Sequence, residues 1–325
     1  MFLVVTIIIV ALVFDFLNGF HDSANSIATV VTTRVLTPTQ AVIMAAFANF
    51  IAAFFFTTSV AATIGKGIVE PTAITPQIIL GGLIAACIWN LITWYIGLPV
   101  SSSHALIGGL IGAAIAKIGF HALIVDGIVK TFLFIFIAPL IGMLGAAIFT
   151  SLVLLIVKNR SNTGMKKTFA RFQILSSFAY SIGHGGNDAQ KTMGIIALTL
   201  FSRNLLGSNF YIPVWVILAS HTAIAIGTFF GGWKIVKTMG SKIIHLNPFE
   251  GFSAETASAV TLFITSALGI PVSTTHVITG SIIGVGTVEN YRKVRWITTR
   301  KILLAWLLTI PVAVFFGMII SVIIP

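Results

Sequence analysis

Two short polar tracts, residues 19–26 and 183–191, interrupt long apolar stretches of this sequence. Each places a carboxylate, Asp22 or Asp188, where the chain should lie deep in a membrane. A charged side chain at the centre of a membrane helix costs roughly 2.5–3.5 kcal/mol, so such residues usually have a function. Carboxylate oxygens are ligands that hard cations prefer. We therefore expect a cation site at each tract; the alternative is that Lys191 or a histidine neutralises the carboxylate.

Two further motifs, residues 97–104 and 269–276, each contain a Pro-Val pair followed by three hydroxyl-bearing residues and a histidine. Proline favours the first turn of a helix, where unpaired backbone N–H groups and the helix dipole attract anions. The hydroxyl groups add donors for a tetrahedral oxyanion, although the same side chains can simply cap the two helices. The two matched copies favour an anion site.

Together these motifs predict two sets of ligands. The anion set is Asn25, Ser101, Ser102, Ser103, His104, Lys191, Ser273, Thr274, Thr275 and His276. The cation set is Asp22, Asn25, Asn187, Asp188, Gln190, Ser102 and Thr274. Lys191 either contacts the anion or neutralises Asp188. The histidines of the four motifs either titrate and couple protons or donate hydrogen bonds.

The composition restricts the class of protein that carries these motifs. Hydrophobic residues make up 57% of the chain, charged residues make up 8%, and the mean hydropathy is +1.05. Soluble domains average about 25% charged residues, so we expect an all-α polytopic membrane protein. The net charge of +11 comes from residues between apolar segments and does not indicate nucleic acid. No nucleophile–base arrangement or metal-ligand cluster indicates an enzyme.

The elements that must position the motifs form a repeat. Glycines in the polar tracts predict a broken transmembrane helix around 19–26 and another around 183–191. The uncharged joints at the Pro-Val motifs predict two re-entrant helical hairpins, at 77–117 and 253–286. Each half of the chain therefore has one broken helix and one hairpin.

The domain boundaries follow from this repeat and from the basic loops. We expect a first repeat at 1–157, a basic cytoplasmic linker at 158–171 and a second repeat at 172–325. Basic residues cluster on one side if both termini lie outside, as the positive-inside rule requires. The two repeats then have inverted topology, an arrangement found in secondary transporters with a site near the membrane midplane.

The chain resembles the PiT family of inorganic phosphate transporters. The resemblance rests on Asp-Ser-Ala-Asn-Ser at 22–26, His-Gly-Gly-Asn-Asp-Ala-Gln-Lys-Thr-Met-Gly at 184–194, and the Pro-Val-Ser motifs beginning at Pro99 and Pro271. It covers nearly the whole chain. The family pattern usually has Gly-Ala-Asn-Asp in the first tract, where this chain has Phe20-His21 before the aspartate. A histidine at that position leaves sodium and proton coupling open.

The resemblance implies import of inorganic phosphate by cation symport, with Na⁺ as the expected cation and alternating access as the mechanism. It also implies a homodimer in the lipid bilayer of the inner (plasma) membrane, with no cofactor besides the co-transported ion and no nucleic acid. Three alternatives remain open. They are proton- or metal-coupled phosphate transport, transport of sulfate by the same fold, and an anion channel.

Overall fold

The computed structural model describes the chain except residues 71–72, 158–161, 208 and 325, and it leaves the side chains of residues 66 and 162–164 undescribed. The first half contains α1 (Phe2–Thr32), α2 (Pro38–Ile51), α3 (Ser59–Gly67), α4 (Pro76–Ile96), α5 (Ser102–Ile118) and α6 (Val125–Val157). The second half contains α7 (Asn162–Ser202), α8 (Val214–Phe230), α9 (Trp233–Ser241), α10 (Pro248–Ala267), α11 (Thr274–Asn290) and α12 (Trp296–Ile323).

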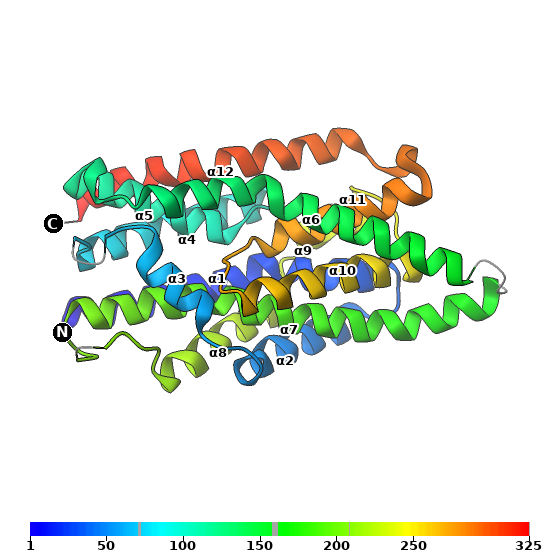
Figure 1. Ribbon diagram of the computed structural model, residues 1–325, viewed down its shortest axis with the longest axis horizontal. Coiled ribbons are helices and arrows are strands. Elements are labelled where there is room, and N and C mark those ends of the chain that lie inside the picture. The colour runs from blue at the N-terminus through cyan, green and yellow to red at the C-terminus, as the bar shows by residue number, and fades with distance from the viewer. Residues whose placement is uncertain (71–72, 158–161, 208, 325) are drawn as a thin grey trace.

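The two halves repeat the same order of elements in opposite directions (Figure 1). Helix α1 runs away from the end of the molecule that holds both termini, and α7 runs back toward it. The hairpin α4–α5 enters from the terminal end, whereas α10–α11 enters from the other end. The predicted fold of two inverted repeats with both termini on one side is confirmed. Which side faces out remains a prediction.

In the described part of the chain, four helices are individually long and apolar enough to cross a membrane: α1, α4, α6 and α12. Two bent helix pairs are further candidates for a span by their combined length and composition. The first, α2–α3, bends by 84°, and the second, α8–α9, bends by 72°. Each half therefore contains one bent pair, α2–α3 or α8–α9. The sequence predicted one break in each half, but placed it in the helix that carries the polar tract.

The predicted breaks at 19–26 and 183–191 are wrong, because α1 and α7 are continuous helices through both tracts. Their glycines permit close packing instead. A Cβ atom on Gly19 would lie 2.1 Å from the carbonyl oxygen of Ile224 on α8. A Cβ atom on Gly186 would lie 2.1 Å from the ring of Phe56. The tracts thus present polar side chains on tightly packed helices.

Both hairpins form where the sequence predicts them. Gly97 ends α4 with a φ of +75°, and Gly269 follows α10 with a φ of +68°; glycine is favoured in this left-handed region. The two tips meet near the middle of the molecule, since the hydroxyl of Thr275 donates to the carbonyl of Val100 over 3.2 Å. Tips that meet inside the bundle are those of re-entrant hairpins.

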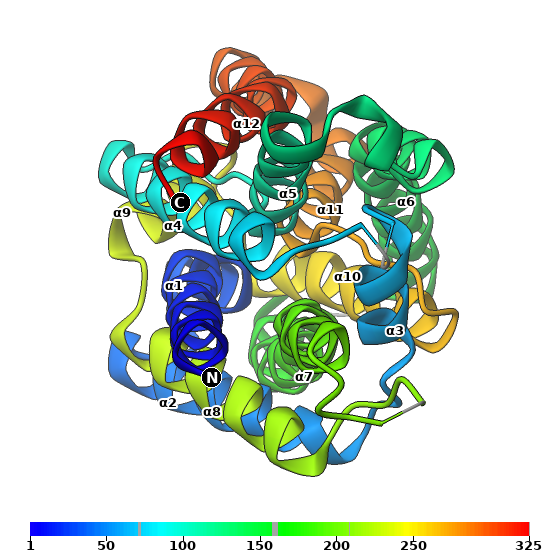
Figure 2. The same cartoon turned by 90° about the vertical axis from the view of Figure 1, so that its left-hand side faces the viewer.

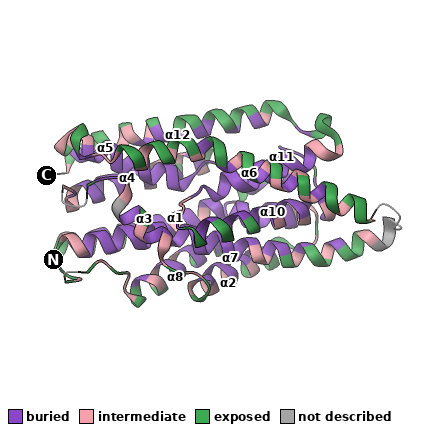
Figure 3. Cartoon of the chain, in the orientation of Figure 1, coloured by how far each residue is buried: buried purple, intermediate pink, exposed green. Residues whose placement is uncertain are grey.

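Helices α1 and α7 lie side by side in the centre of the molecule (Figure 2). The hairpins and α6 and α12 cover one side of this pair, and α2 and α8 cover the other. Buried residues concentrate along the central pair and the hairpin tips, while α6 and α12 expose many apolar side chains (Figure 3). These exposed faces suit contact with lipid.

The predicted linker at 158–171 is shorter than expected. Residues 158–161 lie outside the described part of the chain, and α7 already begins at Asn162. Lysine, methionine, alanine and arginine all favour helices, so this basic stretch extends α7 instead of forming a loop. Its lysines, Lys166 and Lys167, are exposed.

Candidate functional site

The two predicted carboxylates meet in the centre of the molecule. Asp22 comes from α1 and Asp188 from α7, and both are almost completely buried. Three possible ligand atoms lie within 4.8 Å of one another: one carboxylate oxygen of Asp22, one of Asp188 and one ring nitrogen of His184. Residues 166 positions apart in the sequence thus come together at one place in the molecule.

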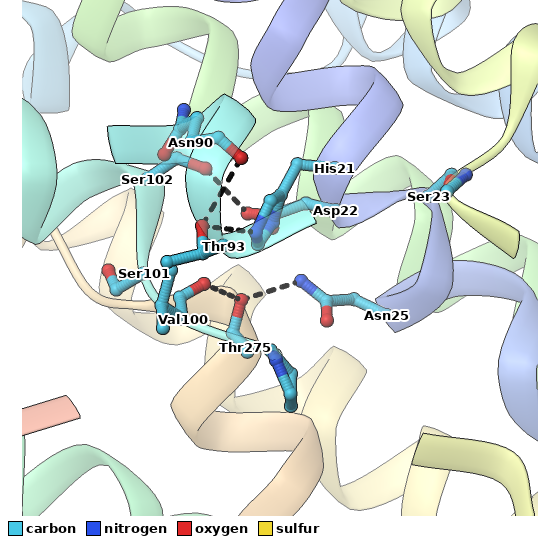
Figure 4. Close-up of polar contacts among 12 residues, drawn as sticks. His21, Asp22, Ser23, Asn25, Asn90, Thr93, Val100, Ser101, Ser102 and Thr275 are labelled. Carbon is cyan, nitrogen blue, oxygen red and sulfur yellow. Dashed lines mark hydrogen bonds and ion pairs between the residues drawn. The ribbon is translucent and has the colours of Figure 1, made fainter. Parts of the chain in front are cut away.

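Each carboxylate accepts a hydrogen bond from the first residue of a hairpin helix. Ser102, at the start of α5, donates to Oδ2 of Asp22 over 3.4 Å (Figure 4). Thr274, at the start of α11, donates to Oδ2 of Asp188 over 3.0 Å. The pseudo-symmetric halves therefore contribute matched pairs, and the N-termini of two helices adjoin the carboxylates.

Lys191 connects both hairpin tips to the cluster. Its ammonium group contacts Asp188, donates to the hydroxyl of Ser103 over 2.5 Å and donates to the carbonyl of Val272 over 2.9 Å. Because Ser103 and Val272 belong to different hairpins, the fixed positive charge lies between the two tips. Both alternatives for Lys191 are therefore compatible with its position, since it neutralises Asp188 and faces the predicted anion site.

Asn25 and Asn187, which lie close in sequence to the two carboxylates, each leave a buried amide oxygen without a partner in the described structure. Asn25 donates its amide to Thr275 over 2.9 Å (Figure 4), and Asn187 donates its amide to Ser266 over 3.1 Å. These bonds orient the amides. Within the described residues, Oδ1 of each asparagine accepts no hydrogen bond. A buried acceptor in this condition can bind a cation or a hydrogen-bond donor.

Comparison with known proteins decides the family. The sequence pattern of the phosphate transporter family matches residues 18–317. The chain belongs to that family. It is therefore a transporter and not an enzyme.

Several relatives align over nearly the full chain. A probable low-affinity inorganic phosphate transporter of Rhizobium meliloti is 54% identical, and the alignment covers 96% of this chain and 93% of that one. A protein of the same description from Bacillus subtilis is 46% identical, with 97% and 95% covered. A solved structure described as the sodium-dependent phosphate transporter has a TM-score of 0.91 at 27% identity, covering 99% of both chains.

In this family member the histidine before Asp22 is bound to that carboxylate. Nδ1 of His21 lies 2.6 Å from Oδ1 of Asp22, and Nε2 lies 3.2 Å from the hydroxyl of Thr93 (Figure 4). Thr93, on α4, was not predicted. It lies in an apolar helix, and its sequence context carries no signal beyond a single hydroxyl. His21 thus links the first carboxylate to the first hairpin.

His184 makes the corresponding contact with the second carboxylate. Its Nε2 lies 3.3 Å from Oδ2 of Asp188, and its Nδ1 lies 3.1 Å from the side-chain oxygen of Asn49 on α2. The sequence marked His184 only as a possible proton carrier or donor. Asn49 in turn donates its amide to Thr228 on α8, so it connects α2 with both α7 and α8.

Three predicted ligands have structural partners instead. The hydroxyls of Ser101 and Ser273 accept the backbone N–H groups of His104 and His276, so the capping alternative applies to both serines. The side-chain oxygen of Gln190 accepts the N–H groups of the first turn of α3, at 2.9 and 3.2 Å. Because that oxygen already accepts two hydrogen bonds, it is occupied by the protein's own backbone in this conformation, and cation binding by Gln190 stays a prediction.

The histidines that follow the hydroxyl triplets pack against each other. The ring centroids of His104 and His276 lie 4.8 Å apart, and His276 stacks on Trp306 of α12 at 3.8 Å. The indole N–H of Trp306 donates to the carbonyl of Pro99 over 2.9 Å. The structure therefore places these two histidines in the contact between the hairpins and α12, and it does not support their assignment to the anion set.

Proposed function

We propose that the protein imports inorganic phosphate by Na⁺ symport through alternating access. The observation that carries this proposal is the combination of two buried carboxylates, two unpartnered amide oxygens and two hydroxyl-bearing helix N-termini in one place. The first two features suit cations, and the third suits an oxyanion. The sodium dependence named for the structurally similar protein supports the same cation.

Phosphate would bind between the hairpin tips. Its oxygens would accept hydrogen bonds from Ser102, Ser103, Thr274 and Thr275 and from the free N–H groups at the starts of α5 and α11. Lys191 would supply a positive charge by turning its ammonium group from the tip carbonyl toward the anion. Neutral hydroxyl and N–H donors would hold the phosphate dianion less tightly than a cluster of cationic side chains, so the bound phosphate could still be released.

Sodium ions would bind beside the anion, on Asp22 with Asn25 and on Asp188 with Asn187. All four side chains offer oxygen, the ligand atom that hard cations prefer. The cations would offset both the carboxylates and the phosphate. An incompletely loaded site would keep uncompensated charge inside the membrane, which disfavours movement of a partly loaded carrier.

Alternating access would arise from movement of the hairpin-containing unit against the remaining spans. The site lies where the tips meet α1 and α7, so displacement of the tips along these helices would expose it to one side at a time. We further propose that the protein works as a homodimer in the inner (plasma) membrane, with its termini outside and repeat boundaries near 157 and 172.

Proton coupling is the second candidate, and the contact between His21 and Asp22 favours it. Histidine is a common proton carrier in proteins, and here it contacts one of the carboxylates proposed to bind the cation. In that case the His21–Asp22 pair would carry the driving ion in place of sodium.

The test is uptake of radiolabelled phosphate by proteoliposomes that contain the purified protein. A sodium gradient and a proton gradient are imposed separately, and sulfate is added as a competitor. We expect uptake that follows the sodium gradient and saturates with phosphate. Uptake driven only by protons would transfer the coupling role to His21. Strong inhibition of phosphate uptake by sulfate would indicate sulfate as the substrate. Uptake that does not saturate with phosphate would indicate a channel.

A further inference from the structure

The polar face of α1 continues from Asp22 toward the N-terminal end of the molecule. Asp15 and Asn18 precede Asp22 by seven and four positions, so all three lie on one side of the helix. Thr192 lies one turn beyond Asp188 on the neighbouring helix α7. Asp15, Asn18 and Thr192 are all buried, with exposed fractions of 0%, 1% and 0%.

These three side chains lack the partners that buried polar groups normally have. Among the described residues, no side-chain oxygen or nitrogen of Asp15 or Asn18 forms a hydrogen bond of regular geometry. The same holds for the hydroxyl of Thr192. The hydroxyl of Thr192 faces the Asp15 carboxylate, and Asp188 and Lys191 lie within electrostatic reach of it. Such unpartnered groups are expensive inside a protein unless a ligand or water satisfies them.

Glu255 shows how this protein treats a buried carboxylate that it stabilises by its own donors. It is also 0% exposed, yet Thr29, Gln173 and Ser176 all donate to it. Asp15 receives no comparable set. The difference indicates that Asp15 is arranged for a ligand from outside the chain.

The charges near Asp15 point to a cation. Asp15, Asp22 and Asp188 are three buried carboxylates, and Lys191 is the fixed cation beside them, bonded to Asp188. The carboxylates of Asp15 and Asp22 are thus left without a lysine or arginine partner in the described part of the chain. Two monovalent cations at separate positions would balance both.

We propose that Asp15, Asn18 and Thr192 form a further binding site for an alkali cation, on the N-terminal side of the phosphate site. A carboxylate, an amide and a hydroxyl all present oxygen, which favours Na⁺ over metals that prefer nitrogen or sulfur. Asp15 lies about 10 Å along the helix axis from Asp22 at a rise of 1.5 Å per residue, so each carboxylate can hold its own ion. A cation that enters from the end with the termini meets this site first. The inference extends the proposed sodium coupling and rests on it.

The test measures binding of radioactive sodium to the purified full-length protein in detergent, without and with phosphate. We expect Asp15→Asn to bind one sodium ion fewer per protein than the wild type while it still binds phosphate at saturating sodium. The exposed carboxylate Asp126, in the first turn of α6, provides a matched control. Asp126→Asn should keep the wild-type number of ions.

A second variant covers the case in which Asp15→Asn fails to fold. Thr192→Val keeps the shape of the side chain and removes the hydroxyl, and it should weaken the affinity for one sodium ion by about tenfold, a change of about 1.4 kcal/mol. Wild-type stoichiometry in Asp15→Asn, or wild-type affinity in Thr192→Val, would overturn the proposal.

The same measurements separate this site from the proposed function. If the wild type takes up phosphate with sodium but Asp15→Asn keeps every sodium ion, only the further site is refuted. If the wild type binds no sodium and its uptake ignores the sodium gradient, both proposals fail together.

Discussion

Lys191, on α7 of the second half, donates a hydrogen bond of 2.5 Å to Ser103, at the tip of the first hairpin. The position that corresponds to Lys191 in α1 is Asn25, which donates to Thr275 of the second hairpin over 2.9 Å. Each central helix is thus bonded to the hairpin of the opposite half. The candidate site is therefore shared between the halves, because these two crossing bonds join the bonds that each half makes on its own, Ser102 to Asp22 and Thr274 to Asp188.

Replacement of either central carboxylate tests its role in coupling. Asp22→Asn and Asp188→Asn keep the size of the side chain and remove the charge that would hold a cation. We expect sodium-driven phosphate uptake to fall at least about 100-fold, equivalent to about 2.7 kcal/mol. Gel filtration in detergent checks folding, and Asp126→Asn is the control for loss of an exposed carboxylate. Uptake at the wild-type rate in either variant would contradict the assignment.

Removal of Lys191 should affect stability as well as transport. Lys191→Met leaves Asp188 as a buried charge without its partner, and such losses typically destabilise proteins by about 3–5 kcal/mol. The double variant Asp188→Asn/Lys191→Met removes both charges, so its thermal unfolding temperature in detergent should return toward the wild-type value. Phosphate uptake should be lost in both the single and the double variant. Equal unfolding temperatures for the single and double variants would show that the pair is not coupled.

Thr275 should matter through its hydroxyl alone. Thr275→Val removes the bonds to Asn25 and to the carbonyl of Val100 and leaves polar groups of both unsatisfied. A loss of about 1–3 kcal/mol is typical for such groups. We expect about a tenfold fall in phosphate uptake, whereas Thr275→Ser, which keeps the hydroxyl, should retain most of it. A Ser variant as impaired as the Val variant would contradict the prediction that the hydroxyl alone matters.

The close approach of α1 and α8 predicts a steric effect at Gly19. Gly19→Ala would force a Cβ atom to within 2.1 Å of a backbone oxygen of Ile224, which the helices can relieve only by moving apart. Overpacking typically costs about 1–3 kcal/mol, so the unfolding temperature should fall. Gly145→Ala in α6 is the matched control, because its Cβ would meet no atom closer than 4.0 Å. Similar unfolding temperatures for both variants would refute the steric argument.

The hairpins and the inverted order of elements were predictable from the sequence because their signals are local. A left-handed glycine, a proline and a hydroxyl triplet recur at Gly97 and Gly269, and they fix where each pair of helices turns. The breaks were not predictable. A glycine in an apolar helix indicates either a break or close packing, and only the neighbouring helix, α8 for Gly19, distinguishes the two.

The candidate site was predictable to the level of residue type but not of partner. Asp22 and Asp188 stand out because they are charged within apolar segments. Gln190 has the same polarity as its neighbours, yet it points at the first turn of α3, which no local pattern reveals. The histidines His104 and His276 repeat in both motifs, but the repetition reflects a contact of one copy with the other.

Trp306 has a consequence for leakage of ions through the protein. It stacks on His276 of one hairpin and donates to the carbonyl of Pro99 in the other, so a single residue of α12 holds both tips. Under the proposed alternating access, a displacement of one tip would be transmitted to the other through this residue, so the two tips would move as one unit. A unit of this kind would expose the site to one side at a time, and ions would then have no continuous path along which to dissipate the membrane potential.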